Sequence, residues 1–217
     1  MAIQIQGNAG VVADVSGTTF RSMKTQPMPY DFATVGHYRT SVTITSTSAQ
    51  AANSRLFEVR NTGSNLLVLT QLRLQAIQGA SGTAQINRLE CFKLTGFSAV
   101  DTTNTVTPVS SVKRTGNMTA YPGNAAVRHL TLAGNVNGMT GGTLTKDTQA
   151  FGAMVTPVTT SAQTVTYILD LSDINQGSHP FVFANNEGWD VESAVLNVTT
   201  FGYTWTIDCS WCEVTAF

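Results

Sequence analysis

The sequence VLNVTTFGYTWTIDCSWCEVTAF, residues 195–217, contains the clearest secondary-structure signal in the chain. Apolar or aromatic side chains occupy every second position within it: Phe201, Tyr203, Trp205, Ile207, Cys209 and Trp211. Side chains of a strand alternate between its two faces, whereas a helix would distribute these residues around its circumference. The pattern therefore predicts a long antiparallel strand with one face on a core.

Other alternating segments precede this strand, and they are separated by turn residues. They are residues 38–44, 56–60, 66–77, 86–97, 127–132, 151–158, 165–171, 179–184 and 191–196. Residues 61–65, NTGSN, tolerate positive φ, so residues 56–77 are predicted to form a β-hairpin. Residues 110–114 are expected to hold at most one helical turn, and residues 138–143, GMTGGT, a flexible loop.

Roughly eight to ten strands without a convincing helix predict an all-β fold. A chain of 217 residues is long enough to bury one good core, and no charged linker marks a second domain. We therefore expect a single β-sandwich or jelly roll over residues 36–217. The absence of a repeat at a fixed period disfavours a propeller or a solenoid.

Residues 1–35 differ from the rest of the chain, because glycines and prolines interrupt them and apolar residues are sparse. The interruptions are Gly7, Gly10, Gly17, Pro27 and Pro29. This composition predicts an extended N-terminal arm that packs on another surface. A flexible terminus is the alternative.

The charged fraction, 12%, is about half of that in a typical globular domain, and the net charge is −1. A surface with so few charges is more typical of a subunit in an assembly than of a freely diffusing enzyme. Lysines and arginines are spread along the chain, so no nucleic-acid partner is expected. No apolar segment approaches the roughly 18 residues that span a bilayer, and the N-terminus does not have the pattern of a secretory signal. We expect no membrane partner, and synthesis and assembly in a cytoplasm.

The candidate metal ligands and nucleophiles do not form a known motif. Three cysteines, an odd number in a reducing compartment, make a disulfide framework unexpected. Cys209 and Cys212 form a CxxC, but positions i and i+3 of a strand point to opposite faces, and Cys91 supplies at most one further zinc ligand. The histidines are far apart in the sequence: His37, His129 and His179. No GxSxG or similar signature supports a catalytic triad.

Two pairs of carboxylates suggest a hydrolytic pair or a calcium site. Asp170 lies near Asp173, and Glu187 lies near Asp190. Their Gly, Asn and Ser neighbours favour turn capping instead. The aromatic stripe of residues 201–211 is also compatible with a sugar-stacking platform, but its regular spacing favours core packing. We therefore predict no catalytic residue, no metal site and no cofactor.

Three segments resemble a recurrent type of tailed-bacteriophage virion protein: SRLFEVRNTGSNLLVLTQLRLQAI (54–77), HPFVFANNEGWDVESAV (179–195), and the final strand ending WCEV (211–214). They share a strand entering "RN" and a Gly-Ser turn, an "NEG" corner, and an aromatic strand with a Trp before its acidic end. The resemblance covers about a third of the chain and concerns architecture, so it implies no site residues. It implies a structural role as a capsid decoration (cement) protein or a related head or tail component.

Three functions remain open on this basis. The first is a decoration protein on the capsid surface, with the major capsid protein and itself, as a homotrimer, for partners, and with no enzymatic activity. The second is a tail, neck or fibre subunit of the same virion. The third is a carbohydrate-binding or glycan-degrading β-sandwich, which requires exposed aromatic rings or paired carboxylates at the separations that glycosidases use.

Overall fold

A computed structural model describes residues 4–6, 12–14, 36–46, 50–79, 81–99, 101, 106–108, 112–113, 123–130, 138–162, 166–170, 180–195 and 202–215. The chain divides into two compact units, Met1–Phe32 and Ala33–Phe217. The first unit contains two short strands, β1 (Gln4–Gln6) and β2 (Val12–Asp14), which pair antiparallel. This pairing was not predicted from the sequence, where the same region suggested an extended arm.

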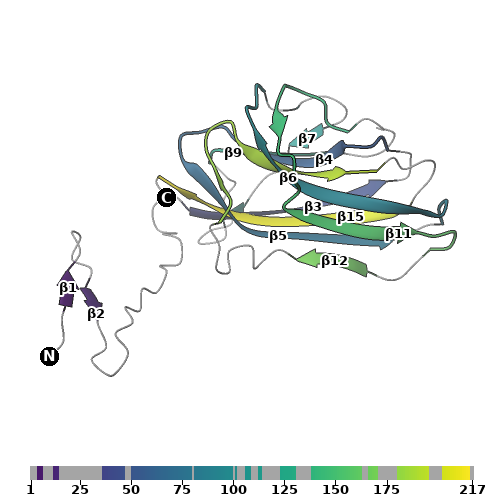
Figure 1. Ribbon diagram of the computed structural model, residues 1–217, viewed down its shortest axis with the longest axis horizontal. Coiled ribbons are helices and arrows are strands. Elements are labelled where there is room, and N and C mark those ends of the chain that lie inside the picture. The colour runs from purple at the N-terminus through teal and green to yellow at the C-terminus, as the bar shows by residue number, and fades with distance from the viewer. Residues whose placement is uncertain are drawn as a thin grey trace. The chain divides into compact units, whose positions relative to one another are not determined.

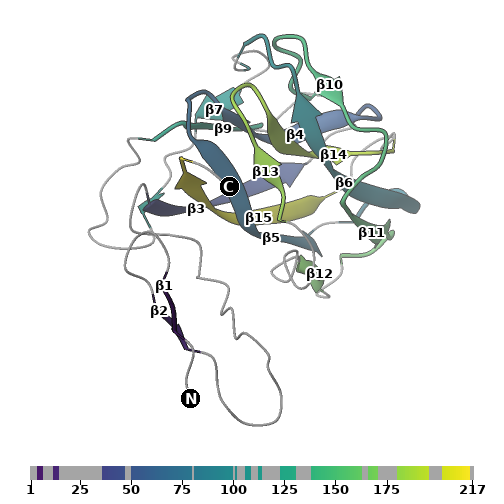
Figure 2. The same ribbon diagram turned by 60° about the vertical axis from the view of Figure 1, so that its left-hand side comes forward.

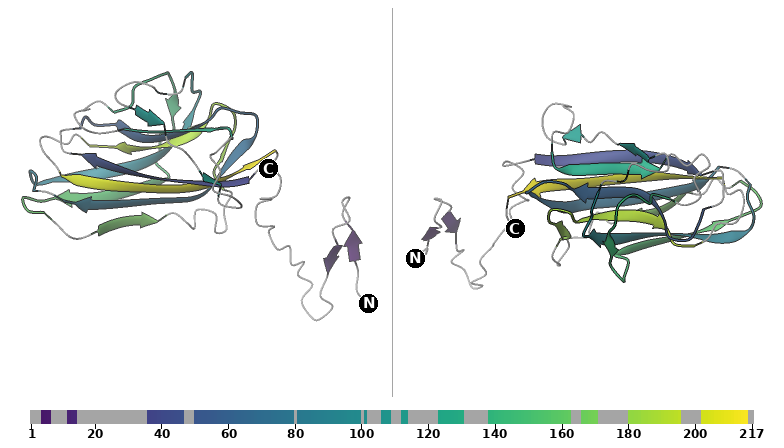
Figure 3. Two further views of the ribbon diagram at one scale, coloured as in Figure 1. Left: turned by 180° about the vertical axis from the view of Figure 1, so that it is seen from behind. Right: turned by 90° about the horizontal axis from the view of Figure 1, so that it is seen from above.

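The second unit consists of two antiparallel sheets packed face to face (Figures 1 and 3). The seven-stranded sheet has the order β10-β6-β14-β4-β9-β7, and β11 also pairs with β6. Its strands are β4 (Ser54–Asn61), β6 (Gln85–Thr95), β7 (Val106–Pro108), β9 (Ala125–Leu130), β10 (Thr145–Lys146), β11 (Gly152–Val158) and β14 (Gly188–Ser193).

The six-stranded sheet has the order β12-β5-β15-β3-β8, and β13 also pairs with β5. Its strands are β3 (Gly36–Ser46), β5 (Leu66–Gln78), β8 (Val112–Lys113), β12 (Thr166–Asp170), β13 (Val182–Phe183) and β15 (Tyr203–Val214). No helix occurs in the part of the chain that the structure describes. The prediction of an all-β sandwich is confirmed. The strands exceed the predicted number because several contain only two or three residues.

Eight of the strands form a nested series of antiparallel pairs. From the innermost pair outward these are β6 with β11, β5 with β12, β4 with β14, and β3 with β15. Successive pairs lie alternately in the seven-stranded and the six-stranded sheet. The series therefore corresponds to one long antiparallel ribbon that folds back and forth across the sandwich.

Strand β15 lies at the centre of the six-stranded sheet, between β3 and β5 (Figure 2). Its residues alternate between buried and half-buried from Tyr203 to Cys209, as the sequence predicted. The register with β5 then shifts between Ser210 and Trp211, and every residue from there to Val214 is buried. The alternation therefore ends at a β-bulge, where both faces of the strand become covered.

The aromatic rings of β15 point into the space between the sheets. Trp205 and Trp211 have no solvent-exposed surface. Trp211 contacts Trp189 of β14 edge-on at 6.2 Å between ring centroids, and Trp189 lies 4.9 Å from the ring of Phe183. These contacts join the two sheets, and aromatic pairs of this geometry stabilise a core beyond the area that they bury. Core packing of the stripe is confirmed from Tyr203 to Trp211, and Phe201 lies outside the described residues.

Two local predictions were wrong. Residues 56–77 do not form a hairpin, because β4 and β5 lie in different sheets: β4 pairs with β14 and β9, while β5 pairs with β15 and β12. The turn at residues 61–65 crosses from one sheet to the other, and turn residues alone do not distinguish these two geometries. The helical turn expected at residues 110–114 is replaced, at its described residues, by strand β8 on the edge of β3.

Candidate functional site

A fully buried asparagine, Asn61, organises the end of the sandwich where β4 crosses to β5. Its amide nitrogen donates hydrogen bonds to the carbonyl oxygens of Asn65, at 2.6 Å, and Phe183, at 3.0 Å. Its side-chain oxygen accepts a hydrogen bond from the Gly63 backbone N–H at 3.0 Å. The side chain thereby fixes the crossing turn and ties it to β13.

The tight turn at residues 184–187 packs on the same end. Its Asn186 adopts a left-handed backbone conformation, with φ of 62°, which asparagine tolerates better than most residues. The Arg60 guanidinium donates to the side-chain oxygen of Asn186 at 2.6 Å, and backbone hydrogen bonds join Asn61 to both Asn186 and Glu187. The Glu187 carboxylate accepts from the Ala184 N–H at 2.9 Å, which is the turn capping that its neighbours in the sequence indicated.

The acidic residue at the end of β15 completes this group. The buried Glu213 carboxylate accepts a 2.9 Å hydrogen bond from the Asn124 backbone N–H, and the side-chain amide of Asn65 lies 3.4 Å from it. We call this set the polar corner: Arg60, Asn61, Asn65, Asn186, Glu187 and Glu213. It joins the "RN" turn, the "NEG" corner and Glu213 of the WCEV segment, which are far apart in the sequence. Its geometry is that of a structural lock between the two sheets.

Substitution of Asn61 by alanine is expected to lower the free energy of unfolding by about 2–4 kcal/mol, because several buried backbone groups lose their partner at once. Asn185→Ala is a matched control, since that side chain is exposed and makes a single 2.9 Å bond to the Gly63 carbonyl. The control is expected to change stability by less than about 1 kcal/mol. Urea denaturation of both variants measures the difference, and equal effects would show that the corner is not a lock.

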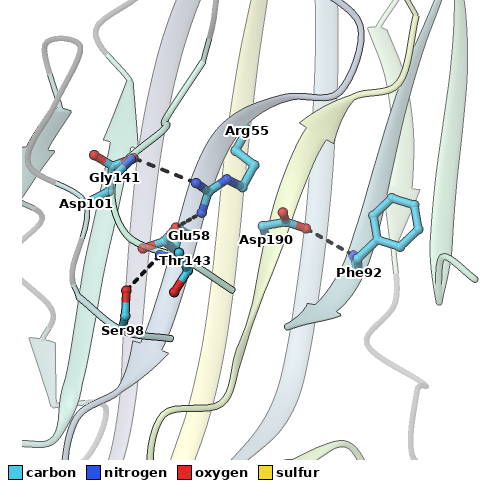
Figure 4. Close-up of polar contacts among 8 residues, drawn as sticks. All are labelled: Arg55, Glu58, Phe92, Ser98, Asp101, Gly141, Thr143 and Asp190. Atoms are coloured by element: carbon cyan, nitrogen blue, oxygen red, sulfur yellow. Dashed lines mark hydrogen bonds and ion pairs between the residues drawn. The ribbon is translucent and has the colours of Figure 1, made fainter. Parts of the chain in front are cut away.

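A second group of polar side chains lies on the face of the seven-stranded sheet that points away from the core. We call it the carboxylate cluster: Arg55, Glu58, Asp101, Lys146, Asp190 and Glu192 (Figure 4 draws all but Lys146 and Glu192). Its four acidic side chains are almost completely buried. Buried carboxyl groups are rare in proteins unless they are paired, so each of them requires a partner or a proton.

A β-bulge in β4 creates one part of this cluster. The register of β14 against β4 shifts between Val191 and Glu192, which pair with Phe57 and Arg55, so Leu56 has no partner in β14. Residues three apart on a regular strand point to opposite faces, but the extra residue of a bulge brings them to the same face. Arg55 and Glu58 therefore share a face and form an ion pair, with 2.5 Å between Nη1 and Oε2.

Asp101 approaches this ion pair from the segment that follows β6 (Figure 4). Its Oδ2 accepts a 2.7 Å hydrogen bond from the Gly141 N–H and lies 3.9 Å from Nη2 of Arg55. The guanidinium of Arg55 thus lies between a carboxylate of the sheet and a carboxylate of the segment above it.

Strand β14 supplies the other two carboxyl groups. Glu192 is paired with Lys146 of β10, with 2.7 Å between Oε1 and Nζ, and the same ammonium lies 4.4 Å from the ring centre of Phe92. Asp190 lies directly opposite Glu58 in the ladder of β14 and β4. Its Oδ1 accepts a 3.3 Å hydrogen bond from the Phe92 N–H, but no ion pair joins it to a lysine or arginine of the described residues.

Burial raises the pKa of two members of the cluster. The pKa of Glu58 rises to about 7, since desolvation outweighs the opposing effect of Arg55. The pKa of Asp190 rises well above its usual range, first because of burial and second because of the nearby Glu192. Both groups are therefore held in the neutral form more readily than in the unfolded chain.

Two segments close over the cluster, and we call them the cover: residues 96–99 with 101, and residues 138–147, which include the edge strand β10. The cover is tied to the sheet by backbone hydrogen bonds from Met139 to Arg55 and from Asp147 to Lys93, each 3.0 Å long. Gly138 has φ of +69°, and a Cβ there would lie 2.7 Å from the Arg55 nitrogen, so only glycine permits this approach. Residues 138–143 form a loop, as predicted, and hydrogen bonds from Met139, Gly141 and Thr143 tie it to its neighbours.

The wild-type protein is expected to lose stability as the pH rises from about 5 to 8. The neutral form of Glu58 is favoured by folding, so its contribution is complete below its unfolded pKa, near 4.5, and disappears as the pH passes its folded pKa of about 7. Glu58→Gln mimics the neutral form at every pH. The difference in unfolding free energy between the two proteins is expected to change by roughly 2–3 kcal/mol over this range. A constant difference in urea denaturation across the same range would contradict the assignment.

The outward face of the six-stranded sheet has a different character. Arg39, Ser41, Thr43 and Thr45 of β3 are exposed, and β15 places Thr204 and Thr206 beside the two threonines. Hydroxyl and amide side chains dominate this face in the part of the chain that the structure describes. We call it the hydroxyl face.

Exposed aliphatic side chains lie near the edges of both sheets. Ile86 and Val155 are 63% and 57% exposed on the paired strands β6 and β11, and Ile168 of the edge strand β12 is 52% exposed. Among the described residues, β11 and β12 each pair with one neighbour only, so their outer edges offer unpaired backbone groups.

The cysteines do not come together as a redox or metal site. All three are buried with free thiols, and burial raises the pKa of each, for Cys212 to about 12. Cys209 and Cys91 belong to the core between the sheets, as predicted for Cys209. Within the described residues, no group of three or more His, Cys, Asp or Glu side chains is placed to hold a metal ion.

The histidines lie apart and have structural partners. His37 shares a 3.0 Å hydrogen bond with the Thr70 hydroxyl, and Nδ1 of His129 donates to the Leu130 carbonyl at 3.0 Å. Burial lowers the pKa of His129. His179 lies outside the described residues.

The structure assigns Glu187 and Asp190, one of the two suggested pairs, to different groups: Glu187 to the polar corner and Asp190 to the carboxylate cluster. Asp170 is exposed on β12, with its Oδ2 4.0 Å from Nε of Arg73, and Asp173 lies outside the described residues. The prediction of turn capping was wrong for Asp190, which lies inside strand β14 and belongs to the carboxylate cluster. Sequence reasoning missed this cluster, because its members are distributed from residue 55 to residue 192. The run of six buried residues in β14 results from it, but no alternation of apolar residues marks it.

No protein-family model matches this chain, and no curated protein matches it. The described residues contain no helix of the length and hydropathy that would cross a bilayer.

Proposed function

We propose that this chain is a structural protein of a tailed-bacteriophage virion, of the capsid decoration (cement) type. In this role it binds the outside of the head and stabilises contacts between major capsid subunits, without enzymatic activity or a cofactor. The observation that carries the proposal is the resemblance of three segments to such proteins, together with the way in which these segments assemble.

The three resembling segments belong to one continuous part of the sandwich. Residues 54–77 contain β4 and β5, residues 179–195 contain β13 and β14, and residues 211–214 end β15. β14 pairs with β4, while β13 and β15 pair with β5. Their shared sequence features meet in the polar corner. A pattern that specifies one three-dimensional unit is stronger support for a common architecture than three unrelated short matches.

The order of the main strands supports the finer assignment to a jelly roll. The nested pairs place β3-β15-β5-β12 in one sheet and β4-β14-β6-β11 in the other. A ribbon of antiparallel pairs wound across two sheets is the arrangement of a jelly roll, which recurs in viral capsid proteins and also in lectins. Because one fold supports many functions, this topology supports the virion role without defining it.

The surface is suited to repeated contacts with another protein. The hydroxyl face is rich in hydroxyl and amide side chains and also carries Arg39, Arg73, Asp170 and Asp208. The whole chain has only 12% charged residues. In this proposal the partners are the major capsid protein and the chain itself, as a homotrimer on the capsid surface. The N-terminal unit adds a strand or a loop to a neighbouring subunit. Many weak contacts repeated over a shell give strong attachment through avidity.

The buried aromatic stripe weakens the carbohydrate-binding alternative. Its rings fill the core, so they are not available to stack on a sugar. The paired carboxyl groups Glu58 and Asp190 are 1% and 0% exposed, which is unsuited to contact with a polymeric substrate. The tail, neck or fibre alternative shares the same architecture and differs in copy number.

The copy number of this chain in purified phage particles tests the proposal. Quantitative mass spectrometry against the major capsid protein is expected to give a ratio near one, or a simple fraction such as one third to two thirds. A ratio of a few per cent would replace the capsid role with a tail, neck or fibre role. Absence from particles, with the major capsid protein detected normally as the internal control, would overturn both virion roles.

A further inference from the structure

We propose that Glu58 and Asp190 form a proton-operated latch, which holds the cover on the seven-stranded sheet while both are protonated and releases it when they ionise. The inference stands on their opposed positions, on the charges around them and on the attachment of the cover to the same groups. It is independent of the virion role.

The two carboxyl groups lie on neighbouring strands and differ in their contacts, because Arg55 is in ion-pair contact with Glu58, whereas no lysine or arginine of the described residues is in ion-pair contact with Asp190. They occupy opposite positions of the β4 and β14 ladder, where side chains on one face are close neighbours. One oxygen of each, Oε1 of Glu58 and Oδ2 of Asp190, is buried without a hydrogen-bond partner. An ionised carboxylate in that situation is strongly destabilised, whereas a protonated one is not. The geometry therefore favours the protonated form of Asp190, and for Glu58 burial outweighs the opposing contact with Arg55.

The charges at the centre of the cluster balance only when two of its four carboxyl groups are protonated. Four buried carboxyl groups, Glu58, Asp101, Asp190 and Glu192, lie with two cations, Arg55 and Lys146, in ion-pair contact. With Glu58 and Asp190 neutral, Arg55 balances Asp101 and Lys146 balances Glu192. With both ionised, the buried group carries a net charge of −2.

The other charged groups on this face do not supply the missing cations. Arg88 of β6 is paired with Glu90, and Arg60 of β4 donates to Asn186 and to the Phe97 carbonyl. Arg128 of β9 lies beside Glu58 in the ladder, but no ion pair joins the two side chains. Arg60 and Arg128 are half-buried, and neither is in ion-pair contact with Glu58 or Asp190.

The cover is attached through Arg55, the cation that also contacts Glu58. Arg55 bridges Glu58 of the sheet and Asp101 of the cover, and Asp101 in turn accepts the Gly141 N–H. Further along, the Ser98 N–H donates to the Thr143 carbonyl at 2.9 Å, and the Ser98 hydroxyl oxygen accepts the Thr143 N–H at 2.7 Å (Figure 4). A small apolar group, Phe92, Leu94 and Phe97 with Leu144 and Ala150, fills the space beneath. A charge of −2 at this position is relieved when the cover lifts and water enters.

Amide hydrogen exchange between about pH 5 and pH 8, corrected for the intrinsic exchange rate, tests the latch. The amides of Ser98, Gly141 and Thr143 report on the cover, and those of Ile207 and Cys209 in β15 report on global unfolding. As the pH rises, protection of the cover amides is expected to fall by more than about tenfold, because opening lets one or both carboxyl groups ionise. The cover amides are also expected to exchange faster than the β15 amides at every pH.

Variants assign the effect to the two carboxyl groups. Glu58→Gln combined with Asp190→Asn is expected to abolish the fall in protection, and each single variant to reduce it. The single variants also provide the test if the double variant does not fold. Asp170→Asn, at an exposed carboxylate of β12, is the matched control and is expected to behave like the wild type.

Three results would overturn the proposal. The first is protection of the cover that does not depend on pH. The second is exchange of cover and β15 amides at equal rates, which would mean that the cover opens only when the whole protein unfolds. The third is recovery of protection at about pH 8 on addition of calcium, which would identify a cation site in place of a proton latch.

Discussion

The edge-on contact between Trp211 of β15 and Trp189 of β14 is the interaction on which the sandwich depends most. Each tryptophan lies on a strand that is paired on both sides, so the contact links the centres of the two sheets. Both rings are fully buried. Around this contact, β15 aligns β3 and β5, and β14 aligns β4 and β6. The outermost of the nested pairs, β3 with β15, brings the end of the chain back to the centre of its sheet.

The two outward faces of the sandwich differ, because one is exposed to solvent and the other is covered by segments of the chain. The six-stranded sheet carries hydroxyl and amide side chains on its outward face and needs no cover. The seven-stranded sheet carries carboxyl groups and the side chains of a second apolar group, and the cover folds over them. Covering this face removes four carboxyl groups from water, and only some of them obtain a cation. In the proposed latch, the dependence on protons is a consequence of covering this face.

The sequence predicts some of these features and not others, for reasons that particular residues make clear. The alternation from Tyr203 to Cys209 is visible because one face of β15 is half-exposed there. It disappears after Ser210, where both faces are buried and no period remains. The turn at residues 61–65 was recognised as a turn, but its residues do not reveal that the chain changes sheets. The carboxylate cluster was not predictable, because it requires a bulge at Leu56, a partner from residue 101 and two residues of β14.

The proposed capsid decoration role connects the sparse charge, the hydroxyl face and the resemblance of the segments that build the polar corner. A three-dimensional reconstruction of the phage particle by electron cryomicroscopy tests this account most directly. The account predicts density that fits the two-sheet sandwich on the outside of the head, over junctions between major capsid subunits and with threefold symmetry. A head whose outer density is fully explained by the major capsid protein, with the sandwich located elsewhere or missing, would contradict it.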